Sequence, residues 1–238
     1  MKQKTELAQL ISDTHGRHTA VPIKKCKILL HAGDFSNWRG SMHEGIAFLD
    51  WMGSQDNAEH KVLVAGNHDT FLKSTDQREA FRERATERGV TFLHNESVEI
   101  DGLKIFGTPY SGWFGNDWAF NASEEKIAEI LKLCPHDTDL IVSHGPPFGV
   151  QDMNKDRSHC GSLSLTAFVL QHQINVLCGH IHESYGQSTT DRGLRFWNAA
   201  IWEHRFDQLN RPIMTTFDAL RSPRTPETEY KEGVKFHG

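Results

Sequence analysis

Residues 61–69, Lys-Val-Leu-Val-Ala-Gly-Asn-His-Asp, place a short apolar run directly before a glycine and three polar side chains. The run 61–65 has the length and the branched residues of a buried strand. Four more apolar runs end in the same way, with Asp or His beside a glycine. The segments that follow those runs are Asp13-Thr14-His15-Gly16, Gly33-Asp34, His144-Gly145-Pro146-Pro147 and Gly179-His180-Ile181-His182. Five predicted strands therefore lead into side chains that serve as metal ligands or as acids and bases.

Short apolar strands alternate along the chain with amphipathic helices, and this alternation predicts an α/β fold. Strands are expected at 7–12, 27–32, 61–65, 139–143, 175–178, 195–197 and 213–217. Asp101-Gly102 separates two further strands, 98–100 and 103–106, as a two-residue hairpin turn does. Helices are expected at 42–52, 76–88, 123–133 and 163–171, with Ser123 as an N-cap residue.

Length and composition favour one domain, expected over residues 1–220. The chain has 238 residues, of which 37% are hydrophobic, enough for a sizeable core. The polar segment 221–238, with Pro223 and Pro226, is expected to be a surface tail or an edge element. The formal net charge of −5 disfavours an extended nucleic-acid-binding surface. A small phosphate ester such as a nucleotide is compatible with this charge, because bound metal ions supply positive charge locally.

The cysteines and the apolar segments indicate where the protein is located. The four cysteines, Cys26, Cys134, Cys160 and Cys178, are scattered and form no C-x-x-C pair. This pattern is typical of reduced thiols in a cytoplasmic protein. Residues 1–10 lack the apolar core of a signal peptide, and no segment approaches the roughly 20 apolar residues of a membrane span. We therefore expect a cytoplasmic protein that does not insert into membranes, and its oligomeric state stays open.

The side chains that follow the five strands form one candidate site. Because the carboxyl ends of neighbouring strands open onto one crevice, side chains that are distant in sequence converge there. The candidate ligands are Asp13, His15, Asp34, Asn67, His144, His180 and His182. Oxygen and imidazole donors without a thiolate suit Mn²⁺, Fe or Zn²⁺ and argue against a structural zinc site. Seven ligands are too many for one ion, but they fit two divalent ions that share a ligand.

The order of these motifs resembles that of the calcineurin-like metallophosphoesterase superfamily: D-x-H, G-D, G-N-H-[D/E], a histidine after the next strand, and G-H-x-H. The resemblance extends from Asp13 to His182. Within the superfamily, the segments 107–110, 112–113 and 143–147 look most like its small metallophosphoesterase-domain-containing branch. The resemblance implies an α/β/β/α sandwich of two mixed sheets flanked by helices. A dinuclear metal site is then expected at the carboxyl ends of the strands.

The resemblance also implies a role for each residue of the site. The ligands of one ion are expected to be Asp13, His15 and His182, and those of the other ion Asn67, His144 and His180. Asp34 corresponds to the carboxylate that bridges the two ions. His68 corresponds to the catalytic histidine, which protonates the leaving oxygen or hydrogen-bonds to it. The implied reaction is hydrolysis of a phosphate ester by a metal-bridging hydroxide.

Three positions depart from the pattern of the superfamily's protein phosphatases. Asn37 and Trp38 stand where those enzymes carry an aspartate and a phosphate-binding arginine, and Ala65 stands where they carry a second arginine. Without these arginines a dianionic monoester is held less well than a singly charged diester. We therefore favour a phosphodiesterase for small diesters such as cyclic nucleotides. The alternatives are a phosphomonoesterase or a nuclease with the same site, and a weakly active or non-catalytic interaction scaffold.

Four residues outside the metal motifs are candidate substrate contacts. Arg17 directly follows the first motif, and Arg157 lies in the loop 149–160, which is long enough to border the crevice. Trp113 and Phe114 belong to the segment 110–120, which is rich in aromatic residues. These aromatic side chains either pack over a sheet edge or stack on a nucleobase near the metals.

Overall fold

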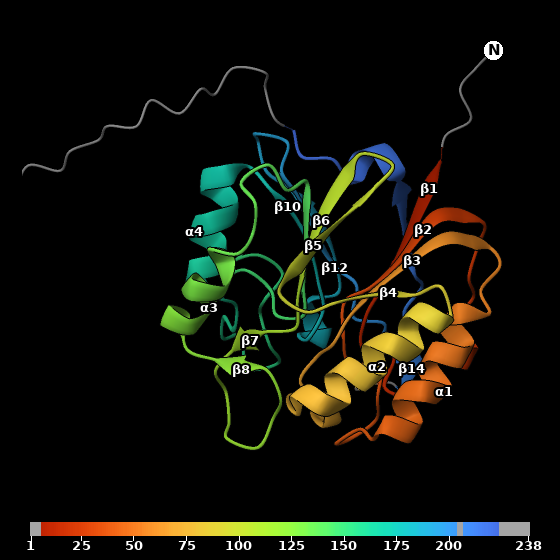
Figure 1. Ribbon diagram of the computed structural model, residues 1–238. Coiled ribbons are helices and arrows are strands. Elements are labelled where there is room, and N and C mark those ends of the chain that lie inside the picture. The colour runs from red at the N-terminus through yellow and green to blue at the C-terminus, as the bar shows by residue number, and fades with distance from the viewer. Residues whose placement is uncertain (1–5, 204–206, 224–238) are drawn as a thin grey trace, which may run out of the picture.

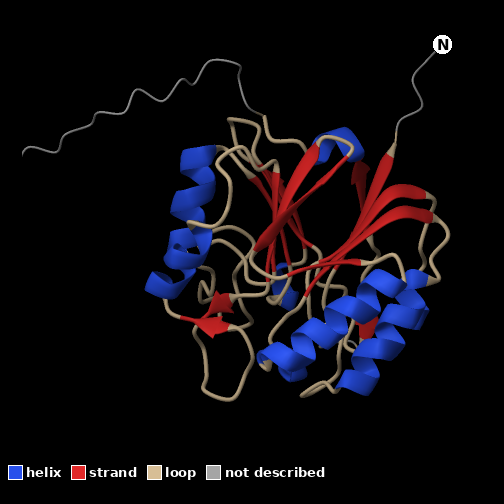
Figure 2. Cartoon of the chain, viewed as in Figure 1, coloured by secondary structure: helices blue, strands red, loops and turns tan. Residues whose placement is uncertain are grey.

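Two mixed β-sheets face each other at the centre of the computed structural model, which describes residues 6–203 and 207–223. Helices α1 (Met42–Gly53) and α2 (Thr75–Glu87) cover the outer face of one sheet, and α3 (Glu124–Leu131) and α4 (Leu163–His172) cover the other (Figures 1 and 2). The layers are therefore α/β/β/α, and the expected fold class is confirmed. Within the described residues, every helix is too short or too polar to cross a membrane.

The first sheet has the strand order β15-β1-β2-β3-β4. Its strands are β1 (Leu7–Ile11), β2 (Cys26–His31), β3 (Ala58–Val64), β4 (Thr91–Leu93) and β15 (Ile213–Thr216). Strands β1 to β4 run parallel, and β15 pairs with β1 in the antiparallel direction. Strands β1, β2 and β3, which precede three of the candidate motifs, consequently end at the same edge of this sheet.

The second sheet has the strand order β11-β12-β10-β9-β6-β5. Its strands are β5 (Glu96–Ile100), β6 (Leu103–Thr108), β9 (Leu140–Ser143), β10 (Asn175–Cys178), β11 (Gly186–Thr189) and β12 (Arg195–Asn198). The central strands β6, β9, β10 and β12 are parallel, and the edge strands β5 and β11 are antiparallel. Strands β9 and β10, which precede the other two motifs, therefore end side by side.

Short elements connect the layers. The pair β7 (Ser111–Gly112) and β8 (Asn121–Ala122) encloses the aromatic-rich segment, and β13 (Trp202–Glu203) pairs with β14 (Gln208–Leu209). Short 3-10 helices are η1 (His18–Ala20), η2 (Thr70–Lys73), η3 (His182–Ser184) and η4 (Phe217–Leu220). A bridge between Ser12 and Ala200 joins the two sheets just beyond β1 and β12. The loops that carry the motifs of both sheets are thereby brought to one end of the sandwich.

The cores on the two faces of a sheet use alternate residues of each strand, because successive side chains point to opposite faces. In β2, Ile28 and Leu30 point into the core between the sheets. Leu29 points the other way and packs in the helical layer with Phe48 of α1 and Phe81 of α2. Burial of each large aliphatic side chain contributes about 1.5–3 kcal/mol, so this alternation fixes which face of the strand meets which layer.

Within the described residues, each α-helix begins after a serine whose side chain accepts a backbone hydrogen bond from the first turn. These N-cap residues are Ser41, Ser74, Ser123 and Ser162. Glu44 completes a reciprocal capping box with Ser41. An N-cap of this kind stabilises a helix by about 1 kcal/mol. The expected cap at Ser123 is confirmed.

Six described strands were not expected from the sequence: the two-residue strands β7, β8, β13 and β14, and the sheet strands β4 and β11. β4 is only three residues long, and β11 is an exposed edge strand whose residues Gly-Gln-Ser-Thr contain no apolar run. The expected strand 213–217 stops at Thr216, because Phe217 begins η4. Most of the expected tail 221–238 lies outside the described residues. Within the described part, Arg221 donates hydrogen bonds to the carbonyl groups of Asp101 and Gly102.

Candidate metal centre

Five loops meet at the carboxyl ends of β1, β2, β3, β9 and β10 and bring the candidate ligands together. Three groups of side chains have potential ligand atoms within 4.8 Å of one another: Asp13, His15 and His182; His15, Asp34 and His68; and Asp34, His144 and His180. The groups overlap at His15 and at Asp34. The side chains therefore form one continuous cluster.

The backbone turns sharply where several of these side chains emerge. Asp13, His15, Asp34 and His180 have φ angles of 53°, 42°, 54° and 68°, in the left-handed region that residues other than glycine rarely adopt. Backbone hydrogen bonds support the turns, from the Asp13 amide to the Gly33 carbonyl at 2.9 Å and from the His15 amide to the Asp34 carbonyl at 3.1 Å. The loops that follow β1 and β2 consequently hold each other in this strained form.

Asp13 lies at the centre of the first group. Its Oδ1 is 3.1 Å from Nε2 of His182 and 3.9 Å from Nε2 of His15. The two imidazole Nε2 atoms are 3.3 Å apart. The backbone amide of His180 donates to both carboxylate oxygens of Asp13, at 3.2 and 3.0 Å. The loops after β1 and β10 are thus joined through this carboxylate.

Asp34 lies between the first group and the remaining imidazoles. Its Oδ2 is 4.0 Å from Nε2 of His15 on one side and 3.3 Å from Nε2 of His144 on the other. Nε2 of His68 is 3.9 Å from the same oxygen, and the His68 backbone amide donates to Oδ1 at 2.7 Å. Nε2 of His144 is also 2.8 Å from Oδ1 of Asn67. One carboxylate therefore faces both halves of the cluster.

Hydrogen bonds at the far side of two rings determine which nitrogen faces the cluster. Nδ1 of His144 donates to the Ala32 carbonyl at 2.9 Å, and Nδ1 of His182 donates to the Trp202 carbonyl at 2.5 Å. In a neutral imidazole with the proton on Nδ1, the lone pair is on Nε2. Metal-ligating histidines usually have such a partner on the outer nitrogen. Both rings therefore turn Nε2 toward the centre, where a metal ion would replace any proton on that nitrogen.

Two glycines make room for the carboxylates. A Cβ atom on Gly66 would lie 2.3 Å from Oδ1 of Asp34, and one on Gly179 would lie 2.1 Å from Oδ2 of Asp13. Both distances are far below van der Waals contact. Any larger residue at either position would displace an acidic side chain of the cluster. Only glycine therefore fits at positions 66 and 179.

The charges of the cluster favour a bound cation. Burial alone would raise the pKa of Asp13 and Asp34, but the surrounding imidazoles hold both pKa values below the usual range of a carboxyl group. Burial would lower the pKa of His144, but Asp34 outweighs it and raises that pKa to about 9. Burial lowers the pKa of His15 to about 4 and that of His180 to about 3. The carboxylates therefore stay ionised while two imidazoles stay neutral, the forms that ligate metals.

The donor set fits divalent metal ions, with carboxylate, amide and imidazole donors and no thiolate among the clustered groups.

A further group, Glu59, His60 and Asp101, has ligand atoms equally close together. There, the ammonium group of Lys27 lies 2.5 Å from Asp101 and 3.3 Å from Glu59. A lysine already neutralises these carboxylates, so that group is an ion-pair network on the surface.

An open pocket of about 230 Å³ lies over the cluster. Its described lining residues are Asp34, Asn67, His68, Phe114, Trp118, His180, His182 and Glu183. The rings of Phe114 and His180 are 5.0 Å apart, and those of Trp118 and His68 are 4.6 Å apart. Aromatic side chains from the segment between β7 and β8 therefore form one wall of the pocket.

The four residues expected to contact substrate lie in different places. Phe114 lines the pocket, whereas Trp113, which is 64% exposed, lines a neighbouring pocket. Arg17 is engaged by Asp207 at 2.7 Å and stacks over the Trp202 ring. Arg157 is exposed and does not contribute to the described lining of the pocket. The structure thus favours Phe114 among these four as a neighbour of the cluster.

Sequence reasoning missed several residues that shape the site. Trp118 forms part of the pocket wall, and Asp69 accepts backbone hydrogen bonds from the motif loops. Asp69 directly follows Gly-Asn-His in the sequence, so its position within that motif was a usable signal. His31 is buried and links two motif loops: it accepts from the Gly33 amide at 3.2 Å and contacts Oγ1 of Thr14 at 3.1 Å. No local pattern indicated that link.

Comparison with known proteins gives the same picture. The family model described as "Calcineurin-like phosphoesterase" matches residues 3–184. Human metallophosphoesterase domain-containing protein 1 is 28% identical over 236 residues, covering 89% of this chain and 71% of that protein. A UPF0046 protein of Caenorhabditis elegans is 33% identical over 215 residues, covering 86% of this chain and 72% of that protein.

Two solved structures share the fold at low sequence identity. TT1561 of Thermus thermophilus has a TM-score of 0.60 at 12% identity, covering 90% of this chain and 99% of that chain. Phosphopantetheinyl hydrolase from Mycobacterium tuberculosis has a TM-score of 0.55 at 15% identity, covering 96% and 99%. At these identities the likeness concerns the fold alone.

Proposed function

Because the chain belongs to the calcineurin-like phosphoesterase family, within its small metallophosphoesterase-domain-containing branch, we propose that its substrates are small phosphodiesters, including cyclic nucleotides. The family supports metal-dependent hydrolysis of phosphate esters. The observation that carries the finer proposal is the pocket over Asp34, whose described lining contains imidazoles and aromatic rings but neither lysine nor arginine.

In this proposal, the two halves of the cluster would hold two divalent ions of the Mn, Fe or Zn type. Asp13, His15 and His182 would hold one ion, and Asn67, His144 and His180 the other. Asp34 would serve both halves, since its Oδ2 atom lies 4.0 Å from Nε2 of His15 and 3.3 Å from Nε2 of His144. When bound, such ions polarise phosphoryl oxygens and lower the pKa of a nucleophilic water.

The protein's own contribution to proton transfer is assigned to His68. Its ring lines the pocket, and its backbone is held by the hydrogen bond to Asp34. Nε2 of His68 faces the cluster, whereas its buried Nδ1 has no hydrogen-bond partner among the described residues. We therefore assign to Nε2 the proton that the leaving oxygen receives.

The charge of the pocket supports diesters over monoesters. Trp38 stands where the superfamily's protein phosphatases carry a phosphate-binding arginine. Its side chain is 67% exposed and packs against Trp118, with 4.7 Å between the ring centroids. Glu183 adds a carboxylate to the pocket lining. A monoester dianion meets neither lysine nor arginine among the described lining residues, whereas a diester carries a single negative charge and can place its second organic group against the aromatic wall.

The test is a substrate panel of cyclic nucleotides, an aryl phosphodiester and an aryl phosphomonoester, with Mn²⁺ supplied. We expect the diesters to have the higher kcat/KM, and Asp34→Asn to reduce it about 100-fold. Asp56→Asn, a matched change at an exposed position, should leave it unchanged. Wild-type turnover by Asp34→Asn would refute the shared role of Asp34.

The other functions predict different results in the same panel. A phosphomonoesterase would prefer the aryl monoester, and a nuclease would cleave single-stranded ends in preference to small diesters. A scaffold would bind no metal and would show no chelator-sensitive turnover. The four free cysteines agree with a cytoplasmic location, which we retain as part of the proposal.

A further inference from the structure

A second pocket adjoins the metal pocket, and the side chain of Trp118 belongs to the wall of both. The second pocket has a volume of about 390 Å³. The cations Lys73 and Arg78 line it together with Tyr110, Trp113 and the amide side chains of Asn116 and Asn121. No carboxylate occurs among its described lining residues. In a protein with net charge −5, this pocket is therefore a local site of positive charge.

Among the described residues, no carboxylate neutralises either cation. Lys73 and Arg78 have no salt-bridge partner there, whereas Arg39, Arg82, Arg84 and Arg88 each have at least one. The guanidinium group of Arg78 donates to the Leu72 carbonyl at 3.0 Å and to Oγ1 of Thr75 at 3.2 Å. These bonds use two of its five N–H groups. The guanidinium group of Arg78 is therefore held in place, and its remaining N–H groups can donate to an anion.

Asp117, the single acidic residue of the segment 113–118, is not among the described residues that line the second pocket. It pairs with Arg39 at 3.4 Å. The side chain of Asn121 fixes the loop from within: its Oδ1 accepts from the Phe114 amide at 3.2 Å, and its Nδ2 donates to the Gly115 carbonyl at 2.6 Å. Phe114 is thereby placed in the metal pocket while Trp113 lines the second pocket.

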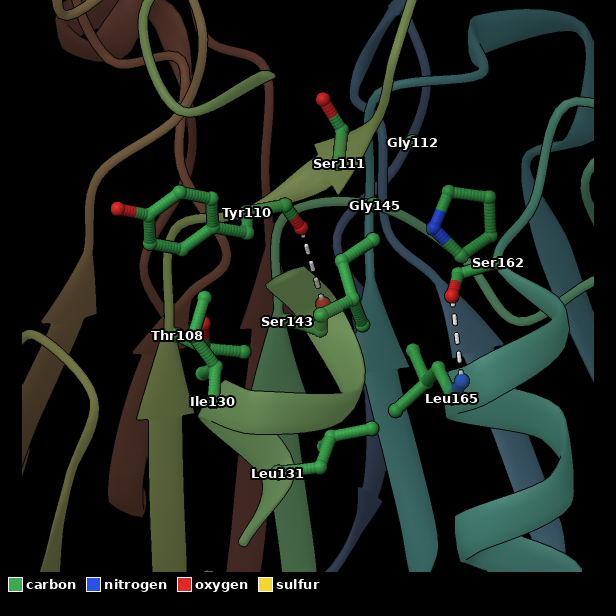
Figure 3. Close-up of a pocket in the computed structure, with 12 residues that line it drawn as sticks. Thr108, Tyr110, Ser111, Gly112, Ile130, Leu131, Ser143, Gly145, Ser162 and Leu165 are labelled. Atoms are coloured by element: carbon green, nitrogen blue, oxygen red, sulfur yellow. Dashed lines mark hydrogen bonds between the residues drawn. The ribbon is translucent and has the colours of Figure 1, made fainter. Parts of the chain in front are cut away.

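The base of this loop is tied to two motif loops of the metal centre. The Ala119 amide donates to the Asn67 carbonyl at 3.1 Å, and the Gly145 amide donates to the Tyr110 carbonyl at 3.2 Å. Ser143 also donates to the Tyr110 carbonyl, as the close-up of the loop base shows (Figure 3). The loop between β7 and β8 lies beside the start of α2 in the ribbon view (Figure 1). The two pockets are therefore built as one unit.

We propose that the second pocket binds a further anionic group of the substrate, a phosphate or a carboxylate, while the reacting diester lies at the metal centre. This inference rests on the proposed function and narrows the substrate class to diesters that carry a second anion. Lys73 and Arg78 supply the charge, because guanidinium and ammonium groups bind phosphate and carboxylate oxygens. Trp118, shared by both pockets, offers a surface on which the organic part between the two anions stacks.

The test compares two chromogenic esters that differ by one phosphate: thymidine 5′-(4-nitrophenyl phosphate) and its 3′-phosphorylated form. With metal-loaded enzyme we expect an approximately tenfold lower KM for the 3′-phosphorylated ester. Lys73→Gln and Arg78→Gln should each remove most of this advantage without changing the KM of the other ester. The matched control is Arg84→Gln, an exposed position of α2 whose partner is Glu87; it should retain the advantage.

Binding of the products gives a second readout that does not depend on turnover. Calorimetry should show thymidine 3′,5′-bisphosphate binding about tenfold more tightly than thymidine 5′-phosphate, and Lys73→Gln should abolish the difference. Lys73 is exposed, so this variant is expected to fold normally. Equal KM values for the two esters, or an advantage that survives in both variants, would overturn the proposal. If neither ester is hydrolysed, the proposed function fails, and the calorimetric comparison alone decides on the second pocket.

Discussion

The carboxylate of Asp69 accepts a hydrogen bond from the backbone amide of Asp34, with 3.1 Å between Oδ2 and the nitrogen. The same oxygen accepts from the Gly66 amide at 2.8 Å, and Oδ1 accepts from the Ser36 amide at 2.9 Å. Asp69 is fully buried. It therefore joins the loop after β2 to the loop after β3 and fixes the backbone from which Asp34 reaches the cluster.

Asp69→Asn should weaken metal binding although Asp69 is outside the proposed ligand set. The amide group of asparagine would place N–H donors against backbone N–H groups, so at least one of the three hydrogen bonds is lost. Loss of such support typically reduces metal affinity 10- to 100-fold. Metal titration followed by atomic absorption measures the change. Asp56→Asn is the surface control, and an unaltered affinity of Asp69→Asn would contradict the supporting role.

Gly179→Ala should disrupt the first half of the cluster. Its Cβ would meet Oδ2 of Asp13 and Oγ of Ser12, each at 2.1 Å, so Asp13 must move away from His182. We expect the metal content to fall below that of the wild type and kcat to fall at least tenfold. Gly112→Ala, whose Cβ would approach no closer than 3.5 Å to the Cys160 carbonyl, is the control. Equal metal content in both variants would refute this packing argument.

Chelation of the metal should destabilise the fold. Without a cation, the buried carboxylates of Asp13 and Asp34 lose charge compensation. A ligand present at 1,000 times its dissociation constant stabilises the native state by about 4.1 kcal/mol. Calorimetric melting with EDTA should therefore give a lower Tm, which Mn²⁺ in excess restores. A Tm that is insensitive to both additions would count against a structural contribution of bound metal.

Because of His94, the free energy of unfolding should decrease as the pH falls from 6.5 to about 4. Burial, with smaller contributions from Arg78 and Arg82, lowers the His94 pKa to about 4, below the usual 6.5 of the unfolded chain. Between pH 6.5 and 4 the unfolded state therefore binds a proton that the folded state does not, and the free energy of unfolding decreases as the pH falls. Below about pH 4 this contribution no longer changes.

The measurement for His94 is urea unfolding of wild type and His94→Gln at several pH values. The variant lacks the titrating group, so its free energy of unfolding should decline less steeply between pH 6.5 and 4. His43→Gln, a change away from the buried cluster, is the control and should follow the wild-type curve. Parallel curves for wild type and His94→Gln would show that His94 does not titrate as its surroundings indicate.

The polar residues at the strand ends could be predicted from the sequence, because they directly follow each strand along the chain. An apolar run such as 61–65 marks a strand, and the residues directly after it, Gly66, Asn67 and His68, must emerge at its carboxyl end. Parallel strands put such ends along one edge. The convergence of Asp34 with His144 follows from this rule once the two sheets face each other.

The surroundings of the cluster were decided only by the tertiary structure. Trp118 lies over His68, and Lys73 lines the same pocket as Trp113, because two sheets pack together and carry their loops to one end. Such contacts join segments far apart in the chain and depend on the path of irregular loops, which leave no periodic pattern. The sequence by itself therefore determined the fold class and the side chains at the strand ends. The walls of the pockets, the support from Asp69 and the charge beside Trp118 arise from packing between distant segments.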